Sequence, residues 1–194
     1  MVIGKHGVTT TTPENIPLGA GTYFKNLKWD TSAKAWTGDC IGATSGGGKL
    51  SIEGEYLDIE LDGALVLFKG QTVKQGGKAS IEVNMAELSG ANLKMTTNFK
   101  EGESDADGYD MFVDKAAIEE GDYIENFGFV GQTANGKKLI VVIFDNALCK
   151  SAFELEGKNK ENSVLKATLE AYAENTGSLD TLPVRIYYPA AAAV

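Results

Sequence analysis

Residues 126–144 read NFGFVGQTANGKKLIVVIF. Two runs rich in β-branched and aromatic residues flank Asn135-Gly136, and this dipeptide favours a tight hairpin turn because both residues tolerate a positive φ. The stretch therefore predicts two antiparallel strands, 126–133 and 137–144, and a fold built on an antiparallel sheet.

Alternation of apolar and polar residues predicts further strands on both sides of this hairpin. In 78–84, Ala79, Ile81 and Val83 share one face of a strand while charged and polar residues share the other. The same period recurs in 22–29, where Tyr23, Leu27 and Trp29 share one phase. It also recurs in 182–188 and in 163–173, and for 163–173 a helix is the alternative.

The stretch LSIEGEYLDIELDGALVLFKG, 50–70, carries acidic residues in alternation with apolar ones. Its apolar residues change faces between Tyr56 and Leu57, so we expect a bulge near Gly54 that restores one buried face. Asp62-Gly63 favours a hairpin turn, after which 64–70 is expected to return as a buried strand.

The period changes to that of a helix in 85–99. Leu88, Ala91, Met95 and Phe99 fall on one helical stripe, which predicts a helix of about four turns.

Seven or eight strands and one helix, without alternation of strands and helices, indicate a mainly β (α+β) fold. We expect two packed antiparallel sheets that form a sandwich or open barrel, with the helix on the outside. Residues 1–20 are rich in Gly, Thr and Pro and predict a flexible arm. The expected division is an arm over 1–20, a single domain over 21–189 and a short tail over 190–194.

Composition limits the functions that the chain can serve. Its 194 residues suffice for one domain with a sizeable core, and its formal net charge of −9 disfavours a protein that grips nucleic acid through phosphates. No apolar run is long enough for a signal peptide core or a membrane span, so no membrane association is expected. Cys40 and Cys149 lack metal-site spacing and are read as isolated, buried thiols rather than a disulfide.

Two catalytic patterns fail on inspection. A phosphate-binding loop in GATSGGGKL, 42–50, would need glycine at Ala43 and a hydroxyl at Leu50, so this stretch is interpreted as a flexible loop. A hydrolytic triad needs a base, and the only histidine, His6, lies in the predicted arm.

The acidic stretch 103–114 partly matches a calcium-binding loop. Gly108 takes the sixth position, but Asp110 stands where an apolar residue is usual and the last ligand is Asp rather than Glu. A solvated acidic loop is the favoured interpretation, and the candidate ligands are Glu103, Asp105, Asp107 and Asp114.

The acidic residues of 53–62 are interpreted as a solvated strand face rather than a catalytic site. Carboxylates that hydrolyse glycosides face each other across a cleft, and one lies in an apolar pocket that raises its pKa. A single exposed row provides neither condition. Its members are Glu53, Glu55, Asp58, Glu60 and Asp62.

The order of these elements resembles the major tail, or tail tube, proteins of long-tailed bacteriophages and prophages. The resemblance runs from about Ile16 to Tyr188, whereas the acidic run KEGESDADGYD and the end PAAAAV have no counterpart in it. The stretches that carry it are NIPLGAGTYF (15–24), GGGKLSIEGEYLDIELDGALVLFKG (46–70), ASIEVNMAELSGANL (79–93), FVGQTANGKKLIVVIFDNAL (129–148), NSVLKATLEAYAE (162–174) and LPVRIYYP (182–189).

The resemblance implies a structural role in the virion tail, without enzymatic activity or cofactor. Six copies would close into a ring, and stacked rings would form a channel that DNA passes through without specific binding. The implied partners are further copies of the chain, a tape measure protein and tail tip or terminator proteins. An acidic lumen is expected from the net charge. The expected subunit-interface strand comprises Leu65, Val66, Leu67 and Phe68.

Three alternatives stay open. The tube of a contractile injection device, a bacteriocin or a type VI secretion system shares the expected fold class. A β-sandwich carbohydrate-binding module would use exposed aromatic residues, for which Trp29, Trp36 and Tyr56 are the candidates. A calcium-dependent enzyme or adhesin would use 103–114.

Overall fold

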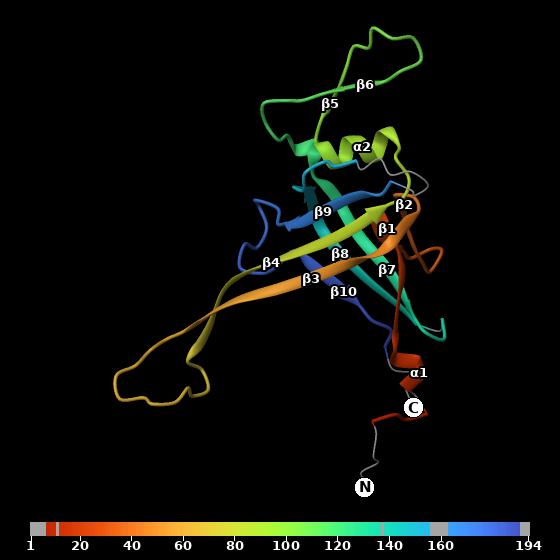
Figure 1. The fold of residues 1–194 in the computed structure, drawn as a ribbon. Coiled ribbons are helices and arrows are strands. Elements are labelled where there is room, and N and C mark those ends of the chain that lie inside the picture. Colours follow the sequence, from red (N-terminus) through yellow and green to blue (C-terminus); the bar gives the residue numbers. More distant parts are fainter. Residues whose placement is uncertain (1–6, 11, 137, 156–162, 191–194) are drawn as a thin grey trace.

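The computed structural model describes residues 7–10, 12–136, 138–155 and 163–190. Strands dominate the described chain, and all their pairings are antiparallel, which confirms the mainly β fold. The elements in Figure 1 are α1 (Thr12–Asn15), β1 (Pro17–Asp30), β2 (Ala35–Cys40), β3 (Thr44–Asp58), β4 (Thr72–Met85), α2 (Gly90–Thr97), β5 (Lys100–Gly102), β6 (Met111–Val113), the 3₁₀ turn η1 (Glu120–Asp122), β7 (Ile124–Thr133), β8 (Leu139–Cys149), β9 (Leu165–Tyr172) and β10 (Val184–Tyr187).

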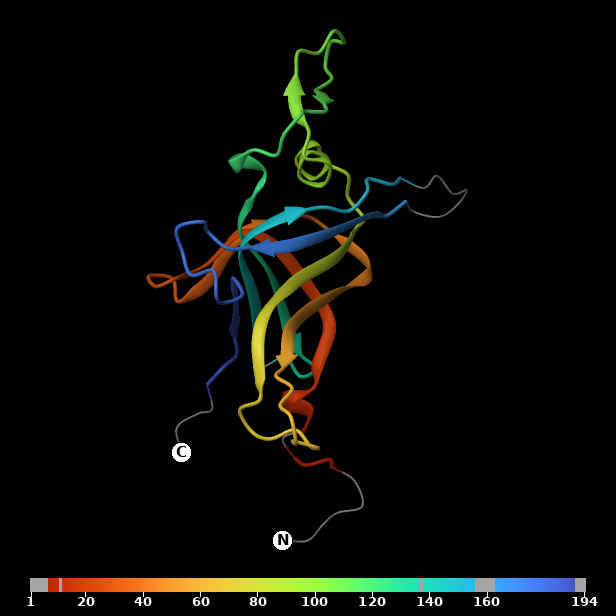
Figure 2. The same cartoon turned by 90° about the vertical axis from the view of Figure 1, so that its left-hand side faces the viewer.

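One large sheet has the strand order β2-β1-β7-β8-β9-β4-β3, and β10 also pairs with β8. The sheet divides at β8, because β7 lines one side of this strand while β10 and β9 share the other. Figure 2 shows the sheet curving so that its two halves face each other. The two expected layers are therefore halves of one continuous sheet.

The main core lies between these halves. Phe127 of β7 and Phe144 of β8 are fully buried there against apolar residues of β4 and β9. Ala79, Ile81 and Val83 point into this core, as their alternation predicted. The alternating residues of β9 are buried in the same way, so 163–173 contains a strand rather than a helix; these are Leu165, Ala167 and Leu169.

A bulge in β1 separates two residues that were expected to share a face. Tyr23 belongs to the main core, whereas Leu27 packs on the opposite face of the sheet. Asn26 lies between them with a φ of 55°, and the pairing with β2 shifts register at this point. Such a bulge inserts one residue and reverses the facing of the residues after it, so the prediction of one phase for 22–29 is wrong.

The hairpin of β7 and β8 forms where Asn135-Gly136 predicted it. Gly136 has a φ of 69°, and its amide donates a 2.7 Å hydrogen bond to the carbonyl oxygen of Thr133. At the same end of the sheet, the amide of Ala134 donates a 2.8 Å bond to the carbonyl oxygen of Ile16. The start of the described chain is thereby held beside this turn.

The expected arm contains ordered elements near its end. Pro17 and Leu18 pair with β7, so the first strand begins inside the segment 1–20. Residues 1–6 and 11 lie outside the described chain, as do 191–194 of the expected tail.

The helix is half as long as the prediction over 85–99. Met85 still belongs to β4, and the amide of Ala86 donates to the carbonyl oxygen of Ala43 in strand-like fashion. The Ser89 hydroxyl then accepts a 3.1 Å bond from the amide of Asn92, which caps the helix from Gly90. Capping at Ser89 excludes 85–89 from the helix, so the four-turn prediction is wrong.

Candidate assembly surfaces

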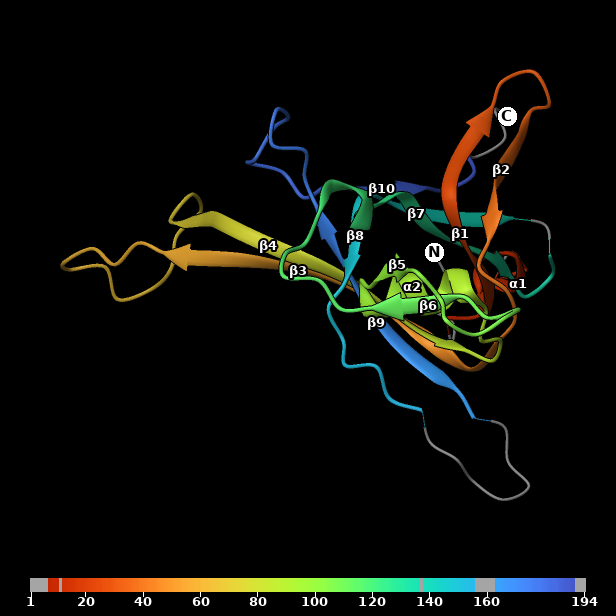
Figure 3. The same cartoon turned by 90° about the horizontal axis from the view of Figure 1, so that it is seen from above.

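The connection 59–71 between β3 and β4, called here the hairpin tip, exposes a run of apolar side chains. β3 and β4 pair as far as Asp58 and Thr72, and Figure 3 shows the two strands projecting away from the rest of the sheet. Leu182 of the β9–β10 connection lies against β4 at Gly77, but residues 59–70 beyond the paired strands are all exposed. The predicted buried strand over 64–70 is therefore wrong, and its residues lie in the tip, where Leu65 is 97% exposed; Val66, Leu67 and Phe68 are exposed as well.

The bulge expected near Gly54 lies next to it, but it does not restore a buried face. The register shifts between Glu55 and Tyr56, where Gln75 of β4 is the extra residue. Apolar residues on both faces remain exposed along the projecting part of β3, including Ile52 and Leu57. The change of register therefore leaves apolar side chains in contact with solvent on both faces of this part of β3.

The carboxylates of 53–62 are exposed and spread along this projection. The pKa of the Glu53 carboxyl is lowered, first by a hydrogen bond from the Ser51 hydroxyl and then by the Lys78 ammonium. A general acid for glycoside hydrolysis needs the opposite shift. The geometry agrees with a solvated acidic face.

The structure brings together aromatic residues that the sequence left scattered. Trp29 and Trp36 pair across β1 and β2 with ring centroids 5.4 Å apart, and Trp36 contacts Tyr187 at 4.7 Å. They line an open hollow of about 640 Å³ on the outer sheet face, called here the aromatic hollow. Tyr56 lies elsewhere, on the projecting part of β3.

The sequence signal for this pairing is the turn between the two tryptophans. The Asp30 carboxylate accepts bonds from the amides of Ser32 and Ala33, at 2.7 and 3.0 Å, and these bonds lower its pKa. An aspartate that folds the chain back in this way is a recognisable turn initiator. Trp29 and Trp36, placed on either side of it, therefore become cross-strand neighbours.

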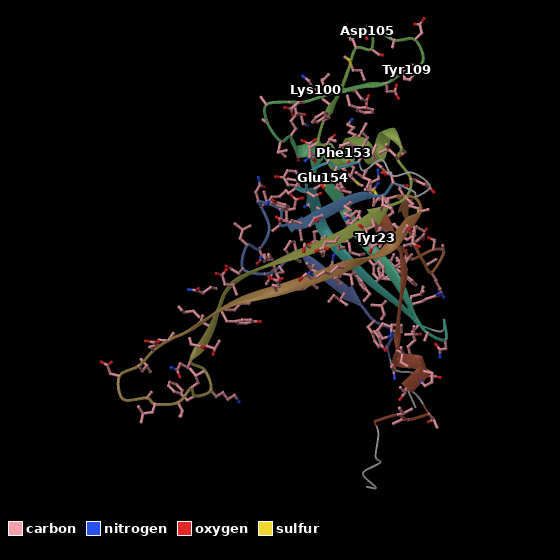
Figure 4. The ribbon with its side chains drawn as sticks, in the orientation of Figure 1. Tyr23, Lys100, Asp105, Tyr109, Phe153 and Glu154 are labelled. Atoms are coloured by element: carbon pink, nitrogen blue, oxygen red, sulfur yellow. The ribbon has the colours of Figure 1, made fainter. Side chains whose placement is uncertain are left out.

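A second hollow, of about 830 Å³, lies between α2, the small sheet β5–β6 and the segment after β8. It is called here the upper hollow. Its apolar lining comes from Leu93, Phe99, Met111, Phe112 and Phe153, and Tyr109 stands at its rim, 75% exposed. Figure 4 shows Asp105 and Tyr109 on the connection above α2, with Phe153 and Glu154 beside the helix.

A hydrogen bond attaches α2 to the main sheet, and an ion pair joins the segment after β6 to the 3₁₀ turn η1. The Asn98 side-chain amide donates a 2.8 Å bond to the carbonyl oxygen of Cys149, which fixes the end of α2 to the end of β8. On the far side of β6, the ammonium of Lys115 lies 2.6 Å from the Asp122 carboxylate, and the two side chains are only 9% and 6% exposed. The upper hollow is thus built on the fixed end of the main sheet.

The predicted calcium ligands are not gathered around one point. Among the described residues, no three acidic, histidine or cysteine side chains lie close enough together to hold a metal ion. Short strands, not helices, flank the acidic connection, so the geometry of a helix–loop–helix calcium site is missing. Glu103, Asp105, Asp107 and Asp114 are all exposed.

Among the residues that the structure describes, the remaining candidates form no catalytic arrangement. Residues 44–50 belong to β3, not to a loop, and no helix follows them that could face a phosphate. Both cysteines are free thiols, with Cys149 buried as expected and Cys40 exposed, contrary to expectation. His6 lies outside the described residues.

Comparisons with known proteins give no assignment: no family model matches the chain, and no curated protein matches it significantly in sequence. Within the described part of the chain, no helix is long and apolar enough to cross a membrane.

Proposed function

We propose that this protein is a structural subunit of a phage or prophage tail tube. It assembles with further copies of itself into stacked hexameric rings, whose channel carries DNA at ejection. It catalyses no reaction and needs no cofactor. Its place is the virion tail, where a tape measure protein and tip or terminator proteins are its further partners.

The observation that carries this proposal is the apolar hairpin tip. Exposure of large apolar side chains on a projecting hairpin is unfavourable. Full burial of each such side chain would stabilise an assembly by about 1.5–3 kcal/mol of free energy. Contiguous exposed apolar patches of this kind mark interaction surfaces. Leu65, Val66, Leu67 and Phe68 are accordingly the proposed subunit contacts.

The sheet supplies the second requirement of a ring, two different edges. β2 and β3 are the outermost strands of the strand order, and within the described residues neither has a strand partner on its outer side. A contact between unlike edges of neighbouring copies is head-to-tail, and such a contact closes into a ring when its rotation closes. The net charge of −9 favours a channel wall that repels DNA phosphates.

Introduction of negative charge at the hairpin tip tests the proposal. The variant L65E/L67E places two carboxylates where apolar burial is required, so its association should be lost while its melting temperature stays unchanged. The matched control is L179E, because Leu179 is 72% exposed on the β9–β10 connection, away from the tip. Sedimentation velocity over a concentration series measures the effect. Equal association of L65E/L67E and L179E would exclude the tip as the contact.

The same features suit the tube of a contractile injection device. Reconstitution with a phage terminator protein or with a contractile sheath protein distinguishes the two assemblies.

The aromatic hollow favours one candidate from another class, a carbohydrate-binding module. Aromatic residues gathered on an open surface can stack against sugar rings, and Trp29, Trp36 and Tyr187 meet this condition. A concentration-dependent change of tryptophan fluorescence with soluble oligosaccharides, lost in Y187A, which keeps both tryptophans, would support this candidate.

A further inference from the structure

We infer that the upper hollow receives residues 1–6 of a second copy of this chain. This inference deepens the proposed self-assembly and rests on it, because it requires a second copy at the upper end of the molecule.

The upper hollow combines an apolar floor with an acidic rim. The connection 101–110 carries five carboxylates and no basic residue. Two of the five, Asp105 and Asp110, line the hollow, and within the described residues neither is hydrogen-bonded or ion-paired. Lys150 also lines it, but its ammonium is 2.7 Å from the Glu170 carboxylate, which neutralises it locally. The hollow therefore suits a segment with apolar side chains next to a positive charge.

Residues 1–6 have this composition. Their sequence is MVIGKH, three large apolar residues followed by Gly4, Lys5 and His6, with no acidic residue. The other apolar segment available for such a contact is the hairpin tip, but it carries Glu60 and Asp62 against Lys69 and is acidic in balance. Charge complementarity thus selects 1–6 over the hairpin tip.

A chain cannot place these residues in its own upper hollow. Asn15 and Ile16 are held beside the β7–β8 turn, where the Lys138 ammonium donates a 2.8 Å bond to Asn15. Figures 1 and 2 place α1 and β5–β6 at opposite ends of the molecule. Residues 7–10 lie below α1, on the side away from β5–β6 (Figure 1). The ten residues of β7 alone span about 33 Å between the two ends, whereas residues 1–6, extended from Gly7, reach about 20 Å.

The occupant must therefore come from another copy. A contact between the lower end of one molecule and the upper end of the next has the same direction at every step. Repetition of such a head-to-tail contact without closure builds an open stack.

Photo-crosslinking of the full chain tests the inference. A benzophenone amino acid replaces Ile3. The protein is then mixed with an equal amount of isotope-labelled chain. The label lets mass spectrometry distinguish crosslinks between two copies from crosslinks within one copy. The expected links join position 3 to 93–112 or 149–153 of a different copy. Links only to other regions, links only within one copy, or no links at concentrations where the protein associates would each overturn the inference.

Charge exchange tests the proposed pairing of charges through the yield of the same crosslinks. K5E and D105K/D110K should each lower the yield of these links about two- to fivefold, the upper part of the range for exposed ion pairs. The combined variant should recover the yield. D180K, a charge reversal on the β9–β10 connection, is the control and should leave the yield unchanged. No recovery in the combined variant would overturn the pairing of charges.

Failure of this inference is distinguishable from failure of the proposed function. A chain that forms tubes while position 3 links elsewhere refutes the docking alone. A chain that does not associate at any concentration refutes both.

Discussion

The side-chain amide of Asn98 donates a 2.8 Å hydrogen bond to the carbonyl oxygen of Cys149, and Asn98 itself has a φ of 56°. One residue thus ends α2 in the left-handed conformation and fastens the helix to the last residue of β8. The floor of the upper hollow depends on this connection.

Two substitutions separate these roles of Asn98. Asn98→Gly keeps the left-handed conformation without strain and loses only the hydrogen bond, so it should cost about 1 kcal/mol of unfolding free energy. Asn98→Ala also places an ordinary side chain at positive φ and should cost about 1–2 kcal/mol more. Urea unfolding measures both, and equal stability of the two variants would refute the conformational part.

The Lys115–Asp122 ion pair should make stability depend on alkaline pH. The hydrogen bond from Lys115 to Asp122 raises the pKa of the lysine in the folded state, with Glu119 adding to the effect. A raised folded pKa contributes stability that is present below the unfolded pKa, about 10.4, and is lost as pH rises through the folded value. The gap in urea midpoint between the wild type and Lys115→Met should therefore be wide at pH 8 and narrow at pH 11.5. A constant gap would contradict this origin.

Gly128 stands where β7 passes close to its neighbours, and a larger residue should not fit. A Cβ atom there would lie 2.7 Å from the carbonyl oxygen of Val142, which belongs to the paired strand and cannot move aside. Gly128→Ala should cost about 2–3 kcal/mol. Gly121→Ala is the control, since nothing lies within 4 Å of its added Cβ, and it should stay within about 0.5 kcal/mol. Thermal unfolding of the two variants measures these losses of stability.

Local sequence signals predicted the strands that have one buried face. They also predicted the hairpin turn whose residues tolerate a positive φ. Asn135-Gly136 specified the β7–β8 hairpin, and the alternation of Leu165, Ala167 and Leu169 identified β9, because both signals depend on residues close in sequence. Predictions that assumed a covering layer were wrong. Leu65–Phe68 looks buried in composition, yet nothing in the described chain lies over it.

The candidate sites were less predictable than the strands. The upper hollow combines residues from α2, β6 and the segment after β8, which the fold alone brings together. The aromatic hollow had a local signal in the Asp30 turn, but its third ring, Tyr187, comes from the far end of the chain. The bulge at Asn26 likewise depends on pairing with β2, so the facing of Leu27 did not follow from alternation alone.

Negative-stain electron microscopy of the concentrated wild-type protein, across a salt series and beside L65E/L67E, tests the central claim of self-assembly most directly. Rings or tubes of uniform width are expected for the wild type, and separate monomers for the variant. Monomers alone for both proteins, at every salt and protein concentration, would contradict that claim.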